Sequence, residues 1–504
     1  MNIRNISLIL ILCSFSLVSL CQNAALKIID TAGCNLAINQ KISDAEYSLK
    51  STSYVANWFS GVLANIDTTK ELTFSLCIEE NNANRTTPDI SKWEGLWPVY
   101  SYGRYWDYNS FVHYSKNADG YWVSNDPFLT GDAKTAGNNK TPTQTVIPAE
   151  LAEEFLSKDG NYWSAWAEIQ NTSATKAVNT FFMTKQFNSS TTAIAMRYPY
   201  TYDYQLQYVK KAEKAKIPGV TVYNIGTSSN INKQNLYVIE VSDPTATEEE
   251  LQDRRVVLMY ANEDGNEPDS SWVVNGAMNY LIQGLNSDSK EVKDILSQTT
   301  FLFIPLLNPD GWRESSYGSL TYSFYSSDFY YRDIKKEVVS YTKFINEWAG
   351  DKKRRLDIIC TMHNIECAEG PNIMFPIIDN TYKGVEELSG FLLKRFGEYK
   401  VSDEVWTYGF MFRRFNGWCS EKWGGLQILT EINSRYPEKR LSLYDLDKVG
   451  EMYVKGFSAY FESEEYEYVL PDIYYRHMLQ TERRNKFLAS GEEKTVRHII
   501  SNGF

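Results

Sequence analysis

Two residues of the chain combine a chemically active side chain with an apolar setting. His363 follows the apolar stretch RLDIICTM, and Glu431 lies within the apolar stretch LQILTEI. A carboxylate buried in such a strand must be paired, protonated or bound to a metal. A buried histidine is by itself more often a hydrogen-bonded structural residue than a metal ligand. His363 therefore indicates a site only if other polar residues join it.

Two further apolar stretches also end in polar residues. RRVVLMYA (254–261) runs into NEDGNEPDSSW, which contains Asp264 and Glu267, and TTFLFIPLL (299–307) runs into NPDGW. In an open α/β sheet, ligands gather at the carboxyl ends of the strands. We therefore expect Asp264, Glu267 and His363, at the ends of neighbouring buried strands, to converge on one divalent ion.

The elements that must position these residues follow from the hydrophobic pattern. From 196 to 463, continuous apolar strands alternate with amphipathic helices, which predicts an α/β domain with a sheet covered on both faces. From 22 to 195, short alternating segments and turn-rich stretches predict a β-sandwich-like domain. The charged segment 464–504 is interpreted as a C-terminal extension.

The N-terminal residues predict export. Arg4 precedes an apolar stretch from Ile6 to Leu20, which is typical of a signal peptide spanning 1–21 and too short for a comfortable membrane span. We expect a secreted or periplasmic protein; lipoprotein anchoring at Cys21 is less favoured because Leu20 precedes it. The formal net charge of -12, with no dense Lys/Arg run, argues against nucleic-acid binding.

Taken together, the polar segments resemble the zinc carboxypeptidase family, and most of all its cytosolic-carboxypeptidase branch, in which a β-sandwich precedes the peptidase. In that family one strand ends in H-x-x-E, a later strand runs into N-P-D-G, and an N-R pair follows. Two further strands then deliver a ligand histidine and a catalytic glutamate. The corresponding positions here are, in chain order, Asp264-Gly265-Asn266-Glu267, Asn308-Pro309-Asp310-Gly311, Tyr331-Arg332, His363, Tyr408 and Glu431.

This resemblance implies a fold and a chemistry. The fold is a mixed, eight-stranded-type sheet sandwiched by helices. One Zn²⁺ ion, held here by Asp264, Glu267 and His363, polarises the scissile carbonyl and activates water. Glu431 is the implied general base, and the implied substrate-binding residues are Arg332, Tyr331 and Tyr408, with Arg332 gripping the C-terminal carboxylate of a peptide or protein.

Three departures separate the chain from this pattern. Asp264 replaces a histidine, so two carboxylates and one imidazole leave a divalent ion without net charge, which favours harder ions such as Mn²⁺ or Ca²⁺. Tyr331 replaces the asparagine of the N-R pair. The family's second arginine, which stabilises the oxyanion, has no clear counterpart, and losing such a donor costs on the order of 10²–10³ in rate.

These departures leave two interpretations of function. The favoured one is a zinc-dependent metallocarboxypeptidase that hydrolyses C-terminal residues of peptides. The alternative is a catalytically impaired relative that binds peptide or glycan in a cleft rich in Tyr and Trp, without turnover. Metal content distinguishes them, because a protein without activity does not need to hold an ion.

Overall fold

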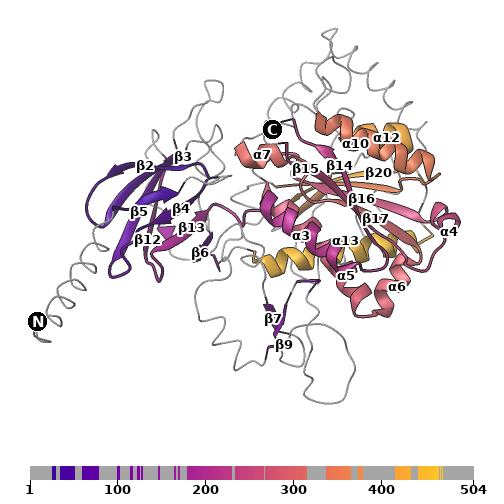
Figure 1. Cartoon of the computed structure of the whole chain (residues 1–504), viewed down its shortest axis with the longest axis horizontal. Coiled ribbons are helices and arrows are strands. Elements are labelled where there is room, and N and C mark those ends of the chain that lie inside the picture. Colours follow the sequence, from indigo (N-terminus) through magenta and orange to yellow (C-terminus); the bar gives the residue numbers. More distant parts are fainter. Residues whose placement is uncertain are drawn as a thin grey trace, which may run out of the picture.

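The structure is a computed structural model of the 504-residue chain. It describes residues 25–29, 34–51, 59–78, 99–102, 114–116, 122–124, 126–128, 146–147, 164–165, 169–170, 179–229, 233–265, 267–314, 336–364, 373–377, 415–432, 441–464, 466 and 468. Figure 1 shows two groups of elements, a strand-rich N-terminal group and a larger α/β group. The predicted signal peptide and most of the C-terminal extension lie outside the described residues, and the domain boundaries stay predictions.

The N-terminal group contains two five-stranded sheets, and a small three-stranded sheet lies apart from that group in Figure 1. The first sheet has the order β1 (Lys27–Ile29), β4 (Ser60–Ala64), β13 (Thr191–Ala195), β6 (Val99–Tyr102), β10 (Ser164–Ala165). The second has the order β11 (Ile169–Gln170), β12 (Asn179–Gln186), β5 (Glu71–Ile78), β3 (Glu46–Ser51), β2 (Leu36–Lys41). The third has the order β7 (Tyr114–Lys116), β8 (Trp122–Ser124), β9 (Val146–Ile147).

The two larger sheets pack face to face. Leu36 of one sheet approaches Gly61 of the other so closely that a Cβ at Gly61 would lie 2.8 Å from the Leu36 Cβ. Apolar side chains of both sheets, among them Val62, Phe74 and Ile194, are fully buried in one cluster. The strand-rich, sandwich-like N-terminal part is therefore as the sequence predicted.

The α/β group is built on a seven-stranded mixed sheet. Its order is β14 (Val220–Thr227), β15 (Asn235–Val241), β17 (Thr299–Ile304), β16 (Arg255–Ala261), β18 (Ile358–Asn364), β20 (Leu426–Ile432), β19 (Ile373–Ile377). The four central strands run parallel, and the strands at both edges pair antiparallel. The mixed α/β class is confirmed, with seven strands of this sheet in the described residues.

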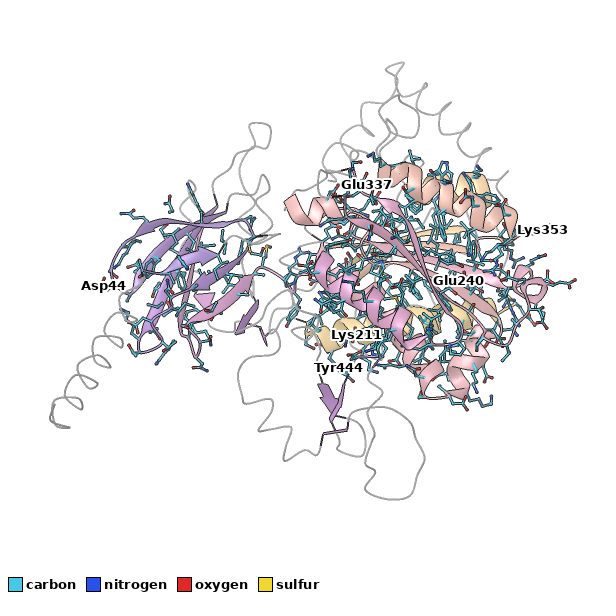
Figure 2. The ribbon with its side chains drawn as sticks, viewed as in Figure 1. Asp44, Lys211, Glu240, Glu337, Lys353 and Tyr444 are labelled. Atoms are coloured by element: carbon cyan, nitrogen blue, oxygen red, sulfur yellow. The ribbon has the colours of Figure 1, made fainter. Side chains whose placement is uncertain are left out.

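Helices cover both faces of this sheet, because its strands are apolar on both sides. Along β16, Val257 and Met259 pack with α5 (Pro268–Asn286) and α13 (Leu443–Phe461). Val256 and Leu258 pack instead with α10 (Lys336–Asn346) and α12 (Phe415–Trp423) on the opposite face. The remaining helices are α3 (Tyr202–Ala215), α4 (Glu248–Gln252), α6 (Lys290–Leu296), α7 (Pro309–Glu314) and a π-helical turn (Glu347–Asp351). Figure 2 shows side chains filling the space between the sheet and both helix layers.

The two long helices on the first face approach each other at paired glycines. A Cβ at Gly276 of α5 would lie 2.4 Å from the Asp447 Cα, and one at Gly450 of α13 would lie 2.2 Å from the Val273 carbonyl oxygen. Larger residues at either position would separate the helices, so this contact fixes α5, whose N-terminus carries part of the candidate site. Among the helices that the structure describes, none is both long and apolar enough to cross a membrane.

Candidate metal centre

The acidic segment after β16 forms a tight turn that leads into α5. Asn262 adopts a positive φ of 60°, which asparagine tolerates better than most residues. The Glu267 N–H then donates to the Asp264 carbonyl at 3.1 Å, and Glu267 becomes the N-cap of α5, with Pro268 as the first helical residue. The turn thus presents both carboxylates, Asp264 and Glu267, at one end of the sheet.

The N-P-D-G segment after β17 holds this turn in place. Asn308 Nδ2 donates to the Glu263 carbonyl at 3.1 Å, and the Asn308 N–H donates to the Asn262 carbonyl at 3.1 Å. The Asn308 Oδ1 atom accepts from the Gly311 N–H at 2.7 Å, which fixes its orientation. A Cβ at Gly311 would lie 2.3 Å from Asn308 Nδ2, so glycine is required there. In this chain the segment supports the turn that carries the acidic residues.

His363 and Glu431 reach the same end of the sheet on adjacent parallel strands. They are register partners in the β18–β20 ladder, and register partners project on the same side of a sheet. Asn364, the next residue, ties three elements together: its Oδ1 accepts from the Ser270 N–H of α5 at 3.0 Å, and its Nδ2 donates to the Ile432 carbonyl at 3.3 Å. The start of α5 is thereby fixed against both strands.

Acidic side chains surround the His363 ring. Its Nδ1 lies 2.8 Å from Glu267 Oε2 and 3.5 Å from Asp264 Oδ2, while its Nε2 lies 3.1 Å from Glu263 Oε2. All of these residues, and Glu431 as well, are buried. The structure therefore brings together the four residues that the sequence predicted for this centre. Their roles as ligands and base stay predictions.

Burial and crowding perturb the acid–base properties of the group. The pKa of Glu267 is raised to about 8: burial is the largest cause, Asp264 and Glu431 add to it, and His363 opposes it. For His363, burial lowers the pKa, but the surrounding carboxylates outweigh burial and hold it well above the usual value. Both shifts mean that Glu267 and His363 hold their protons to higher pH than usual.

The donor set fits a divalent ion. One ligand atom each from Asp264, Glu267 and His363 lies within 4.8 Å of the other two. Tetrahedral ligands with bonds of about 2.0–2.3 Å lie up to about 3.8 Å apart. The three ligand atoms would therefore have to approach one another by about 1 Å to bind one ion. Carboxylate oxygens and an imidazole nitrogen suit Zn²⁺ as well as harder ions.

The site predicted from the sequence and the observed cluster differ in two respects. Arg332, Tyr331 and Tyr408 lie outside the described residues. Conversely, Glu263 belongs to the cluster but has no counterpart in the H-x-x-E motif and was not predicted from the sequence. Its signal in the sequence was an acidic side chain at the end of a buried strand, next to Asp264.

Part of this region is similar in sequence to known carboxypeptidases. Residues 205–322 match the family model for zinc carboxypeptidase; the match includes Asp264, Glu267 and the N-P-D-G segment and ends before His363. Mouse cytosolic carboxypeptidase 2 is 27% identical over 130 residues, which are 25% of this chain and 15% of the relative. Bovine cytosolic carboxypeptidase 3 is 28% identical over 116 residues, 23% of this chain and 11% of the relative. The aligned region thus spans a small fraction of these curated relatives.

Solved structures resemble the chain over most of its length. A putative carboxypeptidase A from Shewanella denitrificans superposes with a TM-score of 0.59 and 13% identity, covering 86% of this chain and 98% of that one. A metallo-carboxypeptidase from Burkholderia cenocepacia gives a TM-score of 0.59 at 14% identity, covering 87% and 99%. These likenesses establish the fold. In sequence, the α/β part is similar to zinc carboxypeptidases over residues 205–322 and to the curated cytosolic carboxypeptidases over a comparable stretch.

Proposed function

We propose that the protein is a metal-dependent carboxypeptidase that removes residues from the C-terminal ends of peptides. The observation that carries this proposal is the convergence of Asp264, Glu267 and His363 at the end of the sheet, with Glu431 in register beside His363. A cluster of buried carboxylates around one imidazole is costly without a cation. A divalent ion would compensate it.

The residues that would hold the ion are Asp264, Glu267 and His363. When bound, the ion supplies a Lewis acid that polarises the scissile carbonyl and lowers the pKa of water. Glu267 stands at the N-cap of α5, where the partial positive charge of the helix end favours a carboxylate. Asn308 keeps the turn that carries both carboxylates in position.

Glu431 is the proposed general base. Its carboxylate lies close enough to Glu267 to raise the pKa of that group, and it stands on the strand next to His363. From there it would take a proton from the attacking water and deliver it to the leaving amine nitrogen. A carboxylate suits both transfers because it can accept the proton and return it within one turnover.

Restriction to chain ends rests on the family resemblance at Arg332, with Tyr331 and Tyr408 as further substrate contacts. An arginine fork binds a terminal carboxylate through two parallel hydrogen bonds.

The test is a pair of peptides of one sequence, one a free acid and the other a C-terminal amide. With Zn²⁺ or Mn²⁺ present, we expect release of the last amino acid from the acid only, and at least about tenfold weaker binding of the amide. Equal cleavage of both would contradict an exopeptidase.

A second candidate is a protein that binds peptide or glycan without turnover. One observation favours it: both ring nitrogens of His363 already face carboxylates, so the charges partly neutralise one another without an ion. Metal analysis of the purified protein separates the two candidates. Stoichiometric metal with release of C-terminal residues supports the peptidase, whereas peptide binding with neither metal nor release supports the second candidate.

We further propose that the protein acts outside the cytoplasm, as a secreted or periplasmic enzyme. The support is the sequence alone: Arg4 followed by the apolar stretch Ile6–Leu20. Cell fractionation of the full-length chain, beside a variant with Leu10→Arg in the apolar stretch, tests this. The variant should remain in the cytoplasm.

A further inference from the structure

Glu263 is a buried carboxylate for which the proposed reaction has no direct use. Its side chain is fully buried, and its Oε2 lies 3.1 Å from His363 Nε2. Its other carboxylate oxygen, Oε1, has no hydrogen-bond partner among the described residues. A buried carboxylate with one oxygen unsatisfied is costly to stability. The stability of the fold therefore does not explain why a carboxylate stands at this position.

The His363 ring separates Glu263 from the other acidic side chains. Asp264 and Glu267 face Nδ1, at 3.5 and 2.8 Å, whereas Glu263 faces Nε2. The lone pairs of the two ring nitrogens diverge, so one ion cannot be bound by Nδ1 and by a carboxylate placed on Nε2. Glu263 is thus on the far side of the ring from the candidate ion, although it adjoins Asp264 in sequence.

We propose that Glu263 is the positioning residue of the metal centre. It accepts a hydrogen bond from the Nε2–H group of His363 and so turns the Nδ1 lone pair toward Asp264 and Glu267. The partner of a ligand histidine commonly fixes its tautomer and orientation in this way. The proposal rests on the proposed function insofar as Nδ1 is the atom that binds the ion.

The backbone around Glu263 is suited to this task. Its carbonyl accepts from Asn308 Nδ2, and the preceding residue, Asn262, holds the positive φ that starts the turn. Two residues of one turn, Glu263 and Asp264, then approach opposite nitrogens of one ring. A single rigid turn therefore sets both the orientation of the histidine and the position of a ligand.

The first test measures Zn²⁺ affinity by calorimetry with the metal alone, in the full chain. Glu263→Met, which removes the acceptor, should weaken binding by about 10–100-fold. Glu263→Gln keeps an acceptor oxygen of the same size and should recover most of that loss. Asp264→Asn, which alters a ligand, serves as the comparison. If Glu263→Gln loses as much affinity as Asp264→Asn, then Glu263 is a ligand and the proposal is overturned. It is equally overturned if a folded Glu263→Met variant binds as the original chain does.

The second test does not depend on catalysis or on metal binding. With ¹⁵N-labelled histidine, the original chain should show an Nε2–H proton of His363 that exchanges slowly with water, assigned by its absence from His363→Asn. Glu263→Gln should keep this signal, and Glu263→Met should lose it. A signal that persists in Glu263→Met contradicts the hydrogen bond. If the signal behaves as expected but no variant binds Zn²⁺, the positioning contact stands and the proposed function fails.

Discussion

Two buried groups of charged side chains belong to the same sheet but differ in how their carboxylates are compensated. The first surrounds Glu240 of β15. Glu240 accepts from Arg354 Nη1 at 2.5 Å, from the Tyr223 hydroxyl at 2.7 Å and from the Trp348 indole at 3.0 Å. Burial raises the pKa of Glu240, but Arg354 and the hydrogen bonds outweigh it, so the pKa is lowered. Figure 2 labels this residue within the α/β group.

The second group, around His363, has more carboxylates than cations among the described residues. The carboxylates of Glu263, Asp264, Glu267 and Glu431 share the end of the sheet with one described imidazole. The pKa of Glu267 is raised to about 8, chiefly by burial and in smaller part by Asp264 and Glu431. A structural carboxylate is matched by its own cation and donors. A buried group with a strongly raised carboxylate pKa is a candidate functional site.

The largest expected effect is on catalysis, and it tests whether the group around His363 is a functional site. Glu431→Gln should lower kcat by about 10²–10⁴-fold, because Gln has the same shape but cannot take a proton. Zn²⁺ affinity and the thermal midpoint should stay near those of the original chain. Glu451→Gln, which alters a carboxylate of α13 paired with Lys448 and Lys455, serves as the matched control. Full activity in Glu431→Gln would remove the assignment of the base.

The next largest effect is on the free energy of unfolding, and it concerns the first group, around Glu240. Glu240→Gln should lower the free energy of unfolding by about 3–5 kcal/mol, because it leaves the Arg354 charge buried without its main partner. Tyr223→Phe removes one neutral donor to the same carboxylate and should cost only about 0.5–1.5 kcal/mol. Chemical denaturation measures both. If Glu240→Gln proves as stable as the original chain, the distinction between the two groups collapses.

Metal addition should stabilise the chain through the second group alone. Zn²⁺ at about 100 times its dissociation constant should raise the free energy of unfolding by about 2.7 kcal/mol, since it binds the folded state. A chelator should reverse the gain. Glu267→Gln should lose most of it, whereas Glu451→Gln should keep it. Equal stabilisation of both variants would place the ion elsewhere.

The sequence predicted the architecture well because the relevant signals are local. The buried strands that carry the site are β16, β17, β18 and β20, and each falls on one of the four apolar stretches. In an α/β domain, a continuous apolar run bounded by polar residues is typical of a strand that is covered on both faces. The convergence of Asp264, Glu267 and His363 followed from the rule that parallel strands present their carboxyl ends at one edge.

What the sequence did not reveal depends on side-chain direction and on pairing across long separations. Glu263 and Asp264 are neighbours in sequence, yet they approach opposite nitrogens of His363, a distinction set by the turn at Asn262. Similarly, nothing in the local pattern at Glu240 indicates that its cation lies 114 residues away, at Arg354. Motif matching also assigned N-P-D-G to the site without indicating that Asn308 acts by holding the turn.

The smallest expected effect concerns a third buried carboxylate, that of Glu337. Its charge is compensated less fully than that of Glu240 but more fully than the charges around His363. It accepts from the Ser229 N–H at 2.6 Å and from the Ser229 hydroxyl, and it shares a hydrogen bond with Asp310. Burial raises its pKa above the usual 4.5 despite the Ser229 contacts. Neutral donors thus compensate this carboxylate less well than Arg354 compensates Glu240. Figure 2 labels Glu337 in the same α/β group.

The sign of the pH effect at Glu337 follows from that raised pKa. The folded state holds the proton more tightly than the unfolded state, so the stability that Glu337 contributes is fully present below about pH 4.5 and is lost as pH rises through the folded pKa. Glu337→Gln imitates the protonated form, with an N–H that can serve Asp310. Relative to the original chain, its thermal midpoint should therefore gain about 1–2 °C between pH 4 and pH 8. Glu347→Gln, an exposed position paired with Lys343, should show no such gain. A relative loss by Glu337→Gln over the same range would mean that Glu337 is compensated as fully as Glu240.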